Sequence, residues 1–252
     1  MILAAGLGTR LQPLTNSRPK ALVEIGGQTL LELTLKRLRG AGIHDVIINT
    51  HHFADMIDDY LRAHHNFGMN VAISREEILL DTGGGLKHAA HFFFDGTTDE
   101  PFLVHNVDVL SNIDFAQMLA FHRAHCALAT LAVQTRTTSR HLLFDEQGVL
   151  CGRRTGTDGP AELVRNVAQT NAFAFSGIHI ISPRIFSLIS EQGVFSIIPV
   201  YLRLAALGQR ILAFPADGFH WRDLGRPEHI EAAAHDIAEG RYSAGADTFI
   251  AR

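Results

Sequence analysis

The first half of the chain alternates β-rich runs with segments whose apolar residues recur at helical spacing. We expect strands at 1–5, 45–49, 70–74 and 101–105, and helices at 29–38, 54–63, 84–93 and 115–125. Such a βαβ series builds a parallel sheet with helices on both faces. Each helix returns the chain to the end of the sheet where the previous strand began, so successive strands run in the same direction. The pattern predicts an α/β fold.

The second half changes to consecutive β-rich runs separated by turns. We expect strands at 127–134, 142–144, 148–151 and 172–181, then helices at 196–207 and 227–238 around a strand at 210–214. Consecutive strands pair in antiparallel fashion, so the sheet is expected to be mixed but mainly parallel. The prediction is a Rossmann-like three-layer α/β/α sandwich in a single domain, residues 1–252. Residues 153–159 are expected to be its most flexible loop.

Composition limits the partners of the chain. A formal net charge of -4 gives no basic field for nucleic acid or for an anionic membrane. No apolar run approaches the roughly 18 residues that a membrane span needs. Cys126 and Cys151 have no CxxC spacing, which indicates free thiols in a reducing compartment. We therefore expect a soluble, cytoplasmic monomer or small homo-oligomer that binds a small phosphorylated ligand.

A glycine-rich turn follows the first expected strand. Gly6 and Gly8 lack a Cβ, so the backbone N–H groups of this turn are able to approach a phosphate. The turn matches neither a Walker A loop nor a dinucleotide fingerprint. Arg10 and Lys20 follow it on a stretch that prolines stiffen. Two cations beside such a turn favour phosphate binding, although an ordinary surface turn is an equal alternative from these residues alone.

Two aspartates from different halves of the chain are candidate metal ligands. Asp108 follows the strand expected at 101–105, at the edge where open α/β sheets bind ligands, and Asp223 comes much later. Mg²⁺ takes carboxylates together with phosphate oxygens of the substrate. Taken singly, strand-end aspartates more often cap a turn, and Asp114 is expected to cap the helix after it. Histidine pairs such as His122 and His125 lack the third ligand that zinc needs.

The run LAAGLGTRLQPLTNSRPKALVEIGG at residues 3–27 resembles the signature of the nucleoside-diphosphate-sugar pyrophosphorylases. The resemblance continues through residues 81–85, 106–108, 175–177 and 221–225, and so covers nearly the whole chain. It implies a glycosyltransferase-A-like nucleotidyltransferase fold, with a nucleotide-binding half at 1–125 and a sugar-binding half at 126–252. The chain ends soon after the helix at 227–238, so no β-helix acyltransferase domain is expected.

The resemblance also implies roles for individual residues. Arg10 would hold the leaving phosphates, Lys20 the α-phosphate or the sugar phosphate, and Asp108 and Asp223 a Mg²⁺ ion; Arg10, Lys20 and Asp108 are the catalytic candidates. The nucleotide-binding candidates are Leu3, Ala4, Ala5, Gly6, Gly8, Thr9, Arg10, Lys20, Glu76, Asp81, Thr82, Gly83 and Asn106. The sugar-binding candidates are Asn106, Ser176, Gly177 and Arg165. From the residues alone, Ser176 and Gly177 equally indicate a bulge in a buried strand.

This chain departs from the family pattern in three places. Val107 stands where many members have glycine or serine, which keeps the carboxylate of Asp108 and alters its turn. The lysine that many members use for the sugar phosphate is absent, so that Arg165, Arg153 or Arg154 would replace it, or Lys20 and Mg²⁺ would suffice. Relatives usually have a few residues before the first strand, so a late start or a shortened strand is expected here.

The resemblance implies an enzyme that transfers a nucleoside monophosphate from an NTP to a sugar 1-phosphate and releases pyrophosphate. The residues themselves leave the base open. The resemblance of the acid and Thr-Gly-Gly-Gly at residues 81–85 to one branch of the family favours UTP with N-acetylmuramate 1-phosphate, with GTP and mannose or heptose 1-phosphate as the alternative. The sugar phosphate is already an anion near pH 7, so no general base is expected. A non-catalytic, sugar-nucleotide-binding regulatory subunit is the rival of another class, and we would expect it to lack one of Arg10, Lys20, Asp108 and Asp223.

Overall fold

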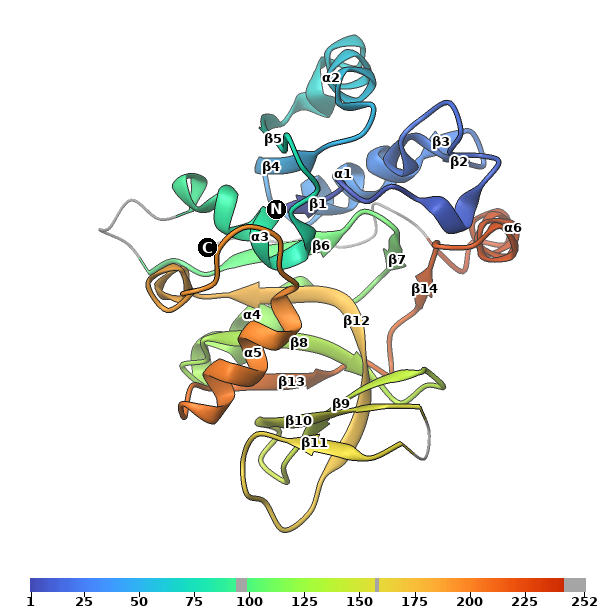
Figure 1. The fold of residues 1–252 in the computed structure, drawn as a ribbon. Coiled ribbons are helices and arrows are strands. Elements are labelled where there is room, and N and C mark those ends of the chain that lie inside the picture. The colour runs from blue at the N-terminus through green and yellow to red at the C-terminus, as the bar shows by residue number, and fades with distance from the viewer. Residues whose placement is uncertain (94–98, 157–158, 243–252) are drawn as a thin grey trace. The chain divides into compact units, whose positions relative to one another are not determined.

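The computed structural model describes residues 1–93, 99–156 and 159–242 (Figure 1). The chain divides into two units that interleave along the sequence. Unit 1 holds Met1–Leu80, His105–Ala116 and the chain from Phe219 onward, whereas unit 2 holds Asp81–Val104 and Gln117–Gly218. Neither unit is one continuous half of the chain. A single domain with functional halves at 1–125 and 126–252 stays a prediction.

Unit 1 contains a set of parallel strands. β1 (Ile2–Leu3) lies between β4 (Asp45–Thr50) and the end of β6 (Phe102–Asn106), and β5 (Asn70–Arg75) pairs with the other side of β4. Ile47 and Ile48 have no exposed surface, so β4 is the centre of this core. Parallel strands buried on both sides read as continuous apolar runs, as the sequence does here.

The remaining elements of unit 1 surround these strands. Thr29 begins α1, where its side chain accepts a hydrogen bond of 3.0 Å from the backbone N–H of Glu32. Two antiparallel strand pairs complete the unit, β2 with β3 and β7 with β14. The bounds are α1 (Leu30–Gly40), α2 (Ala54–Ala63), α6 (Pro227–Ala238), η1 (Thr9–Leu11), η2 (Lys20–Leu22), η3 (His65–Gly68), β2 (Glu24–Ile25), β3 (Gln28–Thr29), β7 (Val109–Ser111) and β14 (Trp221–Asp223).

Unit 2 contains mostly antiparallel strands. The long β12 (Asn171–Ile181) pairs with β8 (Ala129–Gln134) and, near its beginning, with β9 (Arg140–Phe144). β9 continues to β10 (Leu150–Thr155) and β11 (Ala161–Leu163), while β13 (Ile211–Pro215) runs parallel to β8. Its helical segments are α3 (Asp81–His88), η4 (Ala90–Phe92), η5 (Pro183–Ser187), α5 (Ile197–Ala206) and most of α4 (Phe115–Ala124).

The sequence predictions of fold class are confirmed: the chain is α/β, and its strands pair in both parallel and antiparallel fashion. α2 and α6 have the expected bounds. The helix expected at 84–93 begins at Asp81 and ends at His88, with η4 after it. The expectation of a flexible loop at 153–159 is wrong for Arg153 to Thr155, because these residues belong to β10. Residues 157 and 158 of that segment lie outside the described residues.

Candidate active site

The loop after β1 folds back on itself. Gly8 has a φ of 65°, and a Cβ there would lie 2.9 Å from Thr15 Cγ2 and 3.0 Å from Lys20 Cβ. The hydroxyl of Thr15 donates a 2.9 Å hydrogen bond to the carbonyl oxygen of Gly8. Both the left-handed backbone and the lack of space require glycine at this position. The consequence is that Lys20 lies directly beside the glycine-rich turn.

Lys20 forms an ion pair with Asp108, which follows β6. The two side chains are 11% and 19% exposed, so each charge has lost much of its hydration and depends on the other. Two of the three catalytic candidates are therefore in direct contact. The sequence separates them widely, and the parallel pairing of β6 with β1 brings them together.

The second aspartate reaches the same place through the β7–β14 pair. Asp223, the last residue of β14, stands opposite Val109, the first residue of β7. One residue further on, the N–H of Leu224 donates a 2.7 Å hydrogen bond to the carbonyl oxygen of Asp108. Asp108 and Asp223 thus lie at the same end of two paired strands.

Arg10 lies beside Asp223. A Cβ on Gly225 would lie 3.0 Å from Asp223 Oδ1 and 3.2 Å from the Arg10 Nη2 atom. The N–H of Gly225 also donates a 2.9 Å hydrogen bond to Asp223 Oδ1. Gly225 was not among the sequence candidates, and its position directly after the Asp223 turn was the available signal. Arg10, Lys20, Asp108 and Asp223 therefore form one group within unit 1.

An ion-pair network anchors the strand that carries Asp223. Arg222 donates hydrogen bonds to Asp236 on α6, at 2.8 Å from Nε and 2.6 Å from Nη2. The Asp236 side chain is 3% exposed, and His220 Nε2 lies 3.6 Å from its Oδ2. Burial is the largest influence on His220 and lowers its pKa, while Asp236 opposes that effect. β14 is thereby fixed to α6.

A second polar network holds the backbone next to the glycine-rich turn. The N–H of Ala4 donates to Asn49 Oδ1 at 2.7 Å, and Asn49 Nδ2 donates to Glu76 Oε1 at 2.7 Å. The other carboxylate oxygen of Glu76 accepts from the N–H of Leu80 at 2.9 Å. Glu76 is only 3% exposed, so its carboxylate organises the loop rather than facing solvent. Asn49, the end of a parallel strand, was missed by the sequence reasoning.

The residues at the start of α3 are hydrogen-bonded to the segment that leads into α5, also in unit 2. The N–H groups of Gly83 and Gly84 donate to the carbonyl oxygen of Phe195 at 2.9 and 3.0 Å. A Cβ on Gly83 would lie 2.5 Å from the Phe195 ring, and Thr82 Oγ1 accepts from the N–H of Ile197 at 3.0 Å. The N–H groups of Gly83 and Gly84 are therefore already paired with Phe195 and are not open to a ligand.

The sugar-binding candidates belong to elements of both units. Gly177 has a φ of 73° and lies where the register of β12 with β8 shifts, so the bulge that the sequence left open is present. Ser176 beside it is fully buried. Arg165 donates a 2.8 Å hydrogen bond to the carboxylate of Asp145, so its guanidinium already forms an ion pair. Asn106 lies in unit 1, opposite Leu3 at the end of β6.

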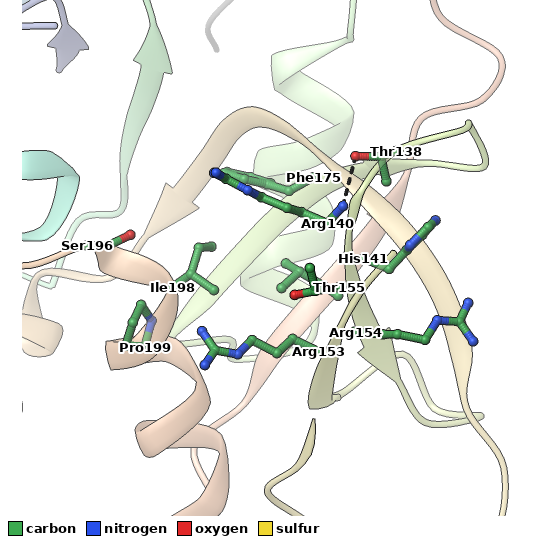
Figure 2. A pocket seen from close by; sticks show the side chains of 11 residues that line it. Thr138, Arg140, His141, Arg153, Arg154, Thr155, Phe175, Ser196, Ile198 and Pro199 are labelled. Atoms are coloured by element: carbon green, nitrogen blue, oxygen red, sulfur yellow. Dashed lines mark hydrogen bonds between the residues drawn. The ribbon is translucent and has the colours of Figure 1, made fainter. Parts of the chain in front are cut away.

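Unit 2 also contains a cavity of about 450 Å³ that the sequence did not predict (Figure 2). Arg140 stands opposite Thr155, and Leu142 stands opposite Arg153, so these four side chains share one face of the β9–β10 pair. Figure 2 shows Arg140 and Arg153 extending toward the start of α5. The full lining is Thr138, Arg140, His141, Leu142, Arg153, Arg154, Thr155, Phe175, Ser196, Ile198 and Pro199.

Comparison with known proteins agrees with this arrangement. A family model described as "Nucleotidyl transferase" matches residues 1–144. N-acetylmuramate alpha-1-phosphate uridylyltransferase of Caulobacter vibrioides is 33% identical over 95% of this chain and 96% of that protein. Mannose-1-phosphate guanyltransferase of Yarrowia lipolytica is 31% identical over 90% of this chain, which spans only 61% of its length.

The chain therefore belongs to the nucleotidyl transferase family, and it is a sugar-1-phosphate nucleotidyltransferase. Its fold agrees with this. A crystal structure of UDP-glucose pyrophosphorylase complexed with UDP-glucose matches 95% of the chain with a TM-score of 0.74 and 21% identity. At that identity the likeness shows the fold alone. Among the described residues, no helix is both long and apolar enough to span a membrane.

Proposed function

We propose that this chain transfers UMP from UTP to N-acetylmuramate 1-phosphate and releases pyrophosphate. The relative from Caulobacter vibrioides, which matches nearly end to end, supports the choice of base and sugar. We also propose that the reaction takes place in the cytoplasm, where the free thiols of Cys126 and Cys151 would stay reduced.

The observation that carries the proposal is the grouping of Arg10, Lys20, Asp108 and Asp223 within unit 1. Two cations and two carboxylates in one place suit a reaction between two polyanions. The guanidinium and ammonium groups reduce phosphate repulsion and stabilise charge on the departing pyrophosphate. A regulatory subunit would have no need of this set.

The chemistry is a displacement at the α-phosphorus of UTP. An oxygen of the sugar phosphate attacks that atom, a new P–O bond forms, and the bond to the β-phosphate bridging oxygen breaks. The leaving oxygen keeps the electron pair, and pyrophosphate departs. Because the second pKa of a phosphate monoester is about 6, the nucleophile needs no protein base at pH 7. Positioning by Arg10 and Lys20 then supplies the main catalytic effect.

We further propose that the enzyme depends on Mg²⁺. Asp108 and Asp223 offer hard carboxylate oxygens at the same end of two paired strands, which suits this ion. Within the described parts of the chain, no three Asp, Glu, His or Cys side chains gather as a metal site. Substrate phosphate oxygens would complete the coordination, as Mg²⁺ prefers. When bound, the ion would neutralise phosphate charge during the displacement.

GTP with mannose 1-phosphate is the second candidate, and the 31% identity to a mannose-1-phosphate guanyltransferase supports it. The decisive experiment measures pyrophosphate release with each of the four NTPs against N-acetylmuramate, mannose, glucose and heptose 1-phosphates. We expect the highest kcat/KM with UTP and N-acetylmuramate 1-phosphate. A preference for GTP with mannose or heptose 1-phosphate would replace that assignment, and activity with no pair would favour the regulatory reading.

The same assay tests the site. Asp108→Asn should abolish magnesium-dependent pyrophosphate release, while Asp59→Asn, which changes an exposed carboxylate on α2, should not alter it. Near-normal release by the Asp108→Asn enzyme would contradict the role assigned to this carboxylate.

A further inference from the structure

A buried arginine of α1 contacts the segment that follows Asp108. Arg37 is only 3% exposed, although its guanidinium is always charged. Its Nε donates a 3.1 Å hydrogen bond to the carbonyl oxygen of Ser111, and its Nη2 donates a 2.8 Å hydrogen bond to that of Ile113. Burial of a charge is costly unless hydrogen bonds replace the lost hydration. These two charge-assisted bonds therefore hold the end of β7 against α1.

Phe115 connects the same guanidinium to the strand on the other side of Asp108. The Arg37 Cζ atom lies 4.5 Å from the centroid of the Phe115 ring, within the range of a cation–π contact. That ring meets the His105 ring edge to face, with the two centroids 6.1 Å apart. His105 belongs to β6 and is 2% exposed. Arg37 thus contacts β7 directly and β6 through two packed rings, all within unit 1.

Asp108 lies in the short turn between these two strands. β6 ends at Asn106 and β7 begins at Val109, so the position of the turn follows from the strands on either side of it. β7 also pairs with β14, and this pairing places Asp223 opposite Val109. A group that fixes both β6 and β7 therefore fixes the backbone that carries both candidate metal ligands.

We propose that Arg37 is a positioning residue for the reaction, because it fixes the strands on either side of Asp108 and, through β14, the place of Asp223. The proposal rests on the role proposed above for these two carboxylates. Arg37 is too deeply buried to touch a substrate, so its effect reaches the reaction through the two aspartates. A misplacement of about 1 Å in an active site costs about 100-fold in rate, so a small shift of this turn should be visible in turnover.

Arg37→Lys is the first test, because lysine keeps the charge but lacks the planar fork that reaches two carbonyl groups at once. We expect kcat to fall by about 10- to 100-fold. KM for the NTP should change by less than about 3-fold, since the substitution leaves the glycine-rich turn untouched. Arg37→Gln, which also removes the charge, should lose more. Steady-state pyrophosphate release measures both parameters.

Arg39→Gln is the matched control for charge. Arg39 lies on the same helix and also donates to a backbone carbonyl, that of Phe67 in η3, at 2.8 Å, but it is exposed. Its substitution should leave kcat unchanged. Ile57→Ala is the control for stability, because it creates a cavity under α2, where Ile57 has no exposed surface. It should lower the melting temperature and leave kcat unchanged at temperatures well below melting.

Phe115→Leu tests the connection to β6 without altering any charge, and it decides the matter if neither Arg37 variant folds. We expect kcat to fall by about 3-fold or more, because His105 and Arg37 lose the ring between them. Two results overturn the proposal. One is a kcat within about 3-fold of wild type for a folded Arg37→Lys protein, or for Phe115→Leu where no Arg37 variant folds. The other is an equal loss of kcat in Ile57→Ala.

Binding of Mn²⁺ to the protein alone gives a readout that does not depend on turnover. Water-proton relaxation should show affinity weakened by about 10-fold or more in Arg37→Lys, the usual effect of losing a group that orients metal ligands. Arg39→Gln and Ile57→Ala should bind Mn²⁺ as the wild type does. If no NTP and sugar phosphate pair is turned over, the proposed function fails, and Mn²⁺ binding alone decides the role of Arg37. Equal affinities in the wild type and in Arg37→Lys would exclude that role.

Discussion

Lys20 forms an ion pair with Asp108, and both side chains are largely withdrawn from water. Replacing Lys20 with Gln removes a cation from the site and leaves a carboxylate without its partner. We expect kcat/KM to fall by about 100-fold or more, comparable to the loss of one group that stabilises transition-state charge. Steady-state pyrophosphate release measures this. Lys36→Gln, which removes an exposed lysine paired with Glu32 on α1, should cost less than about 2-fold.

Gly225 lies close to both Arg10 and Asp223, so Gly225→Ala tests whether the placement of these two side chains matters. The added methyl group would lie 3.2 Å from Arg10 Nη2 and 3.0 Å from Asp223 Oδ1, and the arginine would have to move. A misplacement of about 1 Å in an active site costs about 100-fold. Because contacts of 3.0 and 3.2 Å require a shift of only a few tenths of an ångström, we expect kcat/KM to fall by about 3- to 10-fold. Gly218→Ala is the control, because a Cβ there meets no atom within 4 Å. Equal kcat/KM values for Gly225→Ala and Gly218→Ala would show that the placement of Arg10 and Asp223 beside Gly225 does not affect the reaction.

Asn49 joins the backbone at Ala4 to the buried carboxylate of Glu76. Asn49→Ala leaves a buried N–H and a buried carboxylate oxygen without their partner. The free energy of unfolding in urea should decrease by about 1–3 kcal/mol, and KM for UTP should rise because the glycine-rich turn loses its support. Asn70→Ala removes an exposed amide that pairs with Asp45, and it should change stability by less than about 0.5 kcal/mol.

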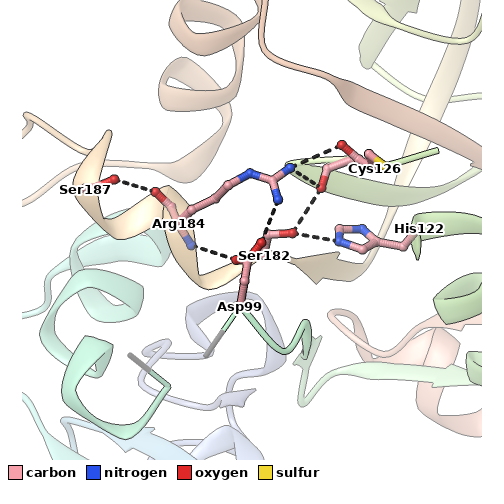
Figure 3. Close-up of polar contacts among 7 residues, drawn as sticks. Asp99, His122, Cys126, Ser182, Arg184 and Ser187 are labelled. Atoms are coloured by element: carbon pink, nitrogen blue, oxygen red, sulfur yellow. Dashed lines mark hydrogen bonds and ion pairs between the residues drawn. The ribbon is translucent and has the colours of Figure 1, made fainter. Parts of the chain in front are cut away.

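His122 makes stability depend on pH. Burial, followed by the charge of Arg184, lowers its pKa to about 4. Its Nδ1 atom lies 2.9 Å from Thr130 Oγ1, and its Nε2 atom contacts Ser182, as Figure 3 shows. Because the folded pKa lies below the unfolded value of about 6.5, the stabilising effect is complete above pH 6.5. It decreases as the pH falls from about 6.5 toward 4, by about 1.4 kcal/mol for each pH unit.

Urea titrations between pH 7.5 and 5 measure this dependence. His122→Gln should reduce the slope of unfolding free energy against pH, whereas His125→Gln, at an exposed position, should not. His105 has its pKa lowered to about 4, chiefly by burial, so part of the slope should remain in the His122→Gln protein. An unchanged slope would show that His122 is not the source.

The sequence predicts the parts of the fold that have long, regular patterns. α2 and α6 are amphipathic over several turns, and their bounds agree with the expectation. β7 and β14 were missed because three residues each give no detectable period. Yet the pairing of β7 with β14 brings Asp223 to the same strand end as Asp108. The sequence therefore indicated both aspartates as candidates but did not predict the strand pair that places them together.

The same limit applies to polar residues. Glu76 was a nucleotide-binding candidate, but only the structure shows that its two oxygens serve Asn49 and Leu80. Arg140 was overlooked because a single arginine in a strand carries no signal. It lines the cavity because the register of β9 with β10 places it on the same face as Leu142 and opposite Thr155. Register depends on pairing partners that local sequence patterns do not specify.

The interleaving of the two units has a consequence for biosynthesis. Unit 1 begins with β1 and the glycine-rich turn, but it is completed only by the chain from Phe219 onward, which supplies β14 and Asp223. A ribosome therefore releases all of unit 2 before the last pieces of unit 1 emerge. Until β14 and α6 have been synthesised, β7 lacks the strand with which it pairs, and the ion pair between Arg222 and Asp236 cannot form. A nascent chain therefore gains the complete group of Arg10, Lys20, Asp108 and Asp223 only after unit 2 has been synthesised, and termination within unit 2 yields a protein without Asp223.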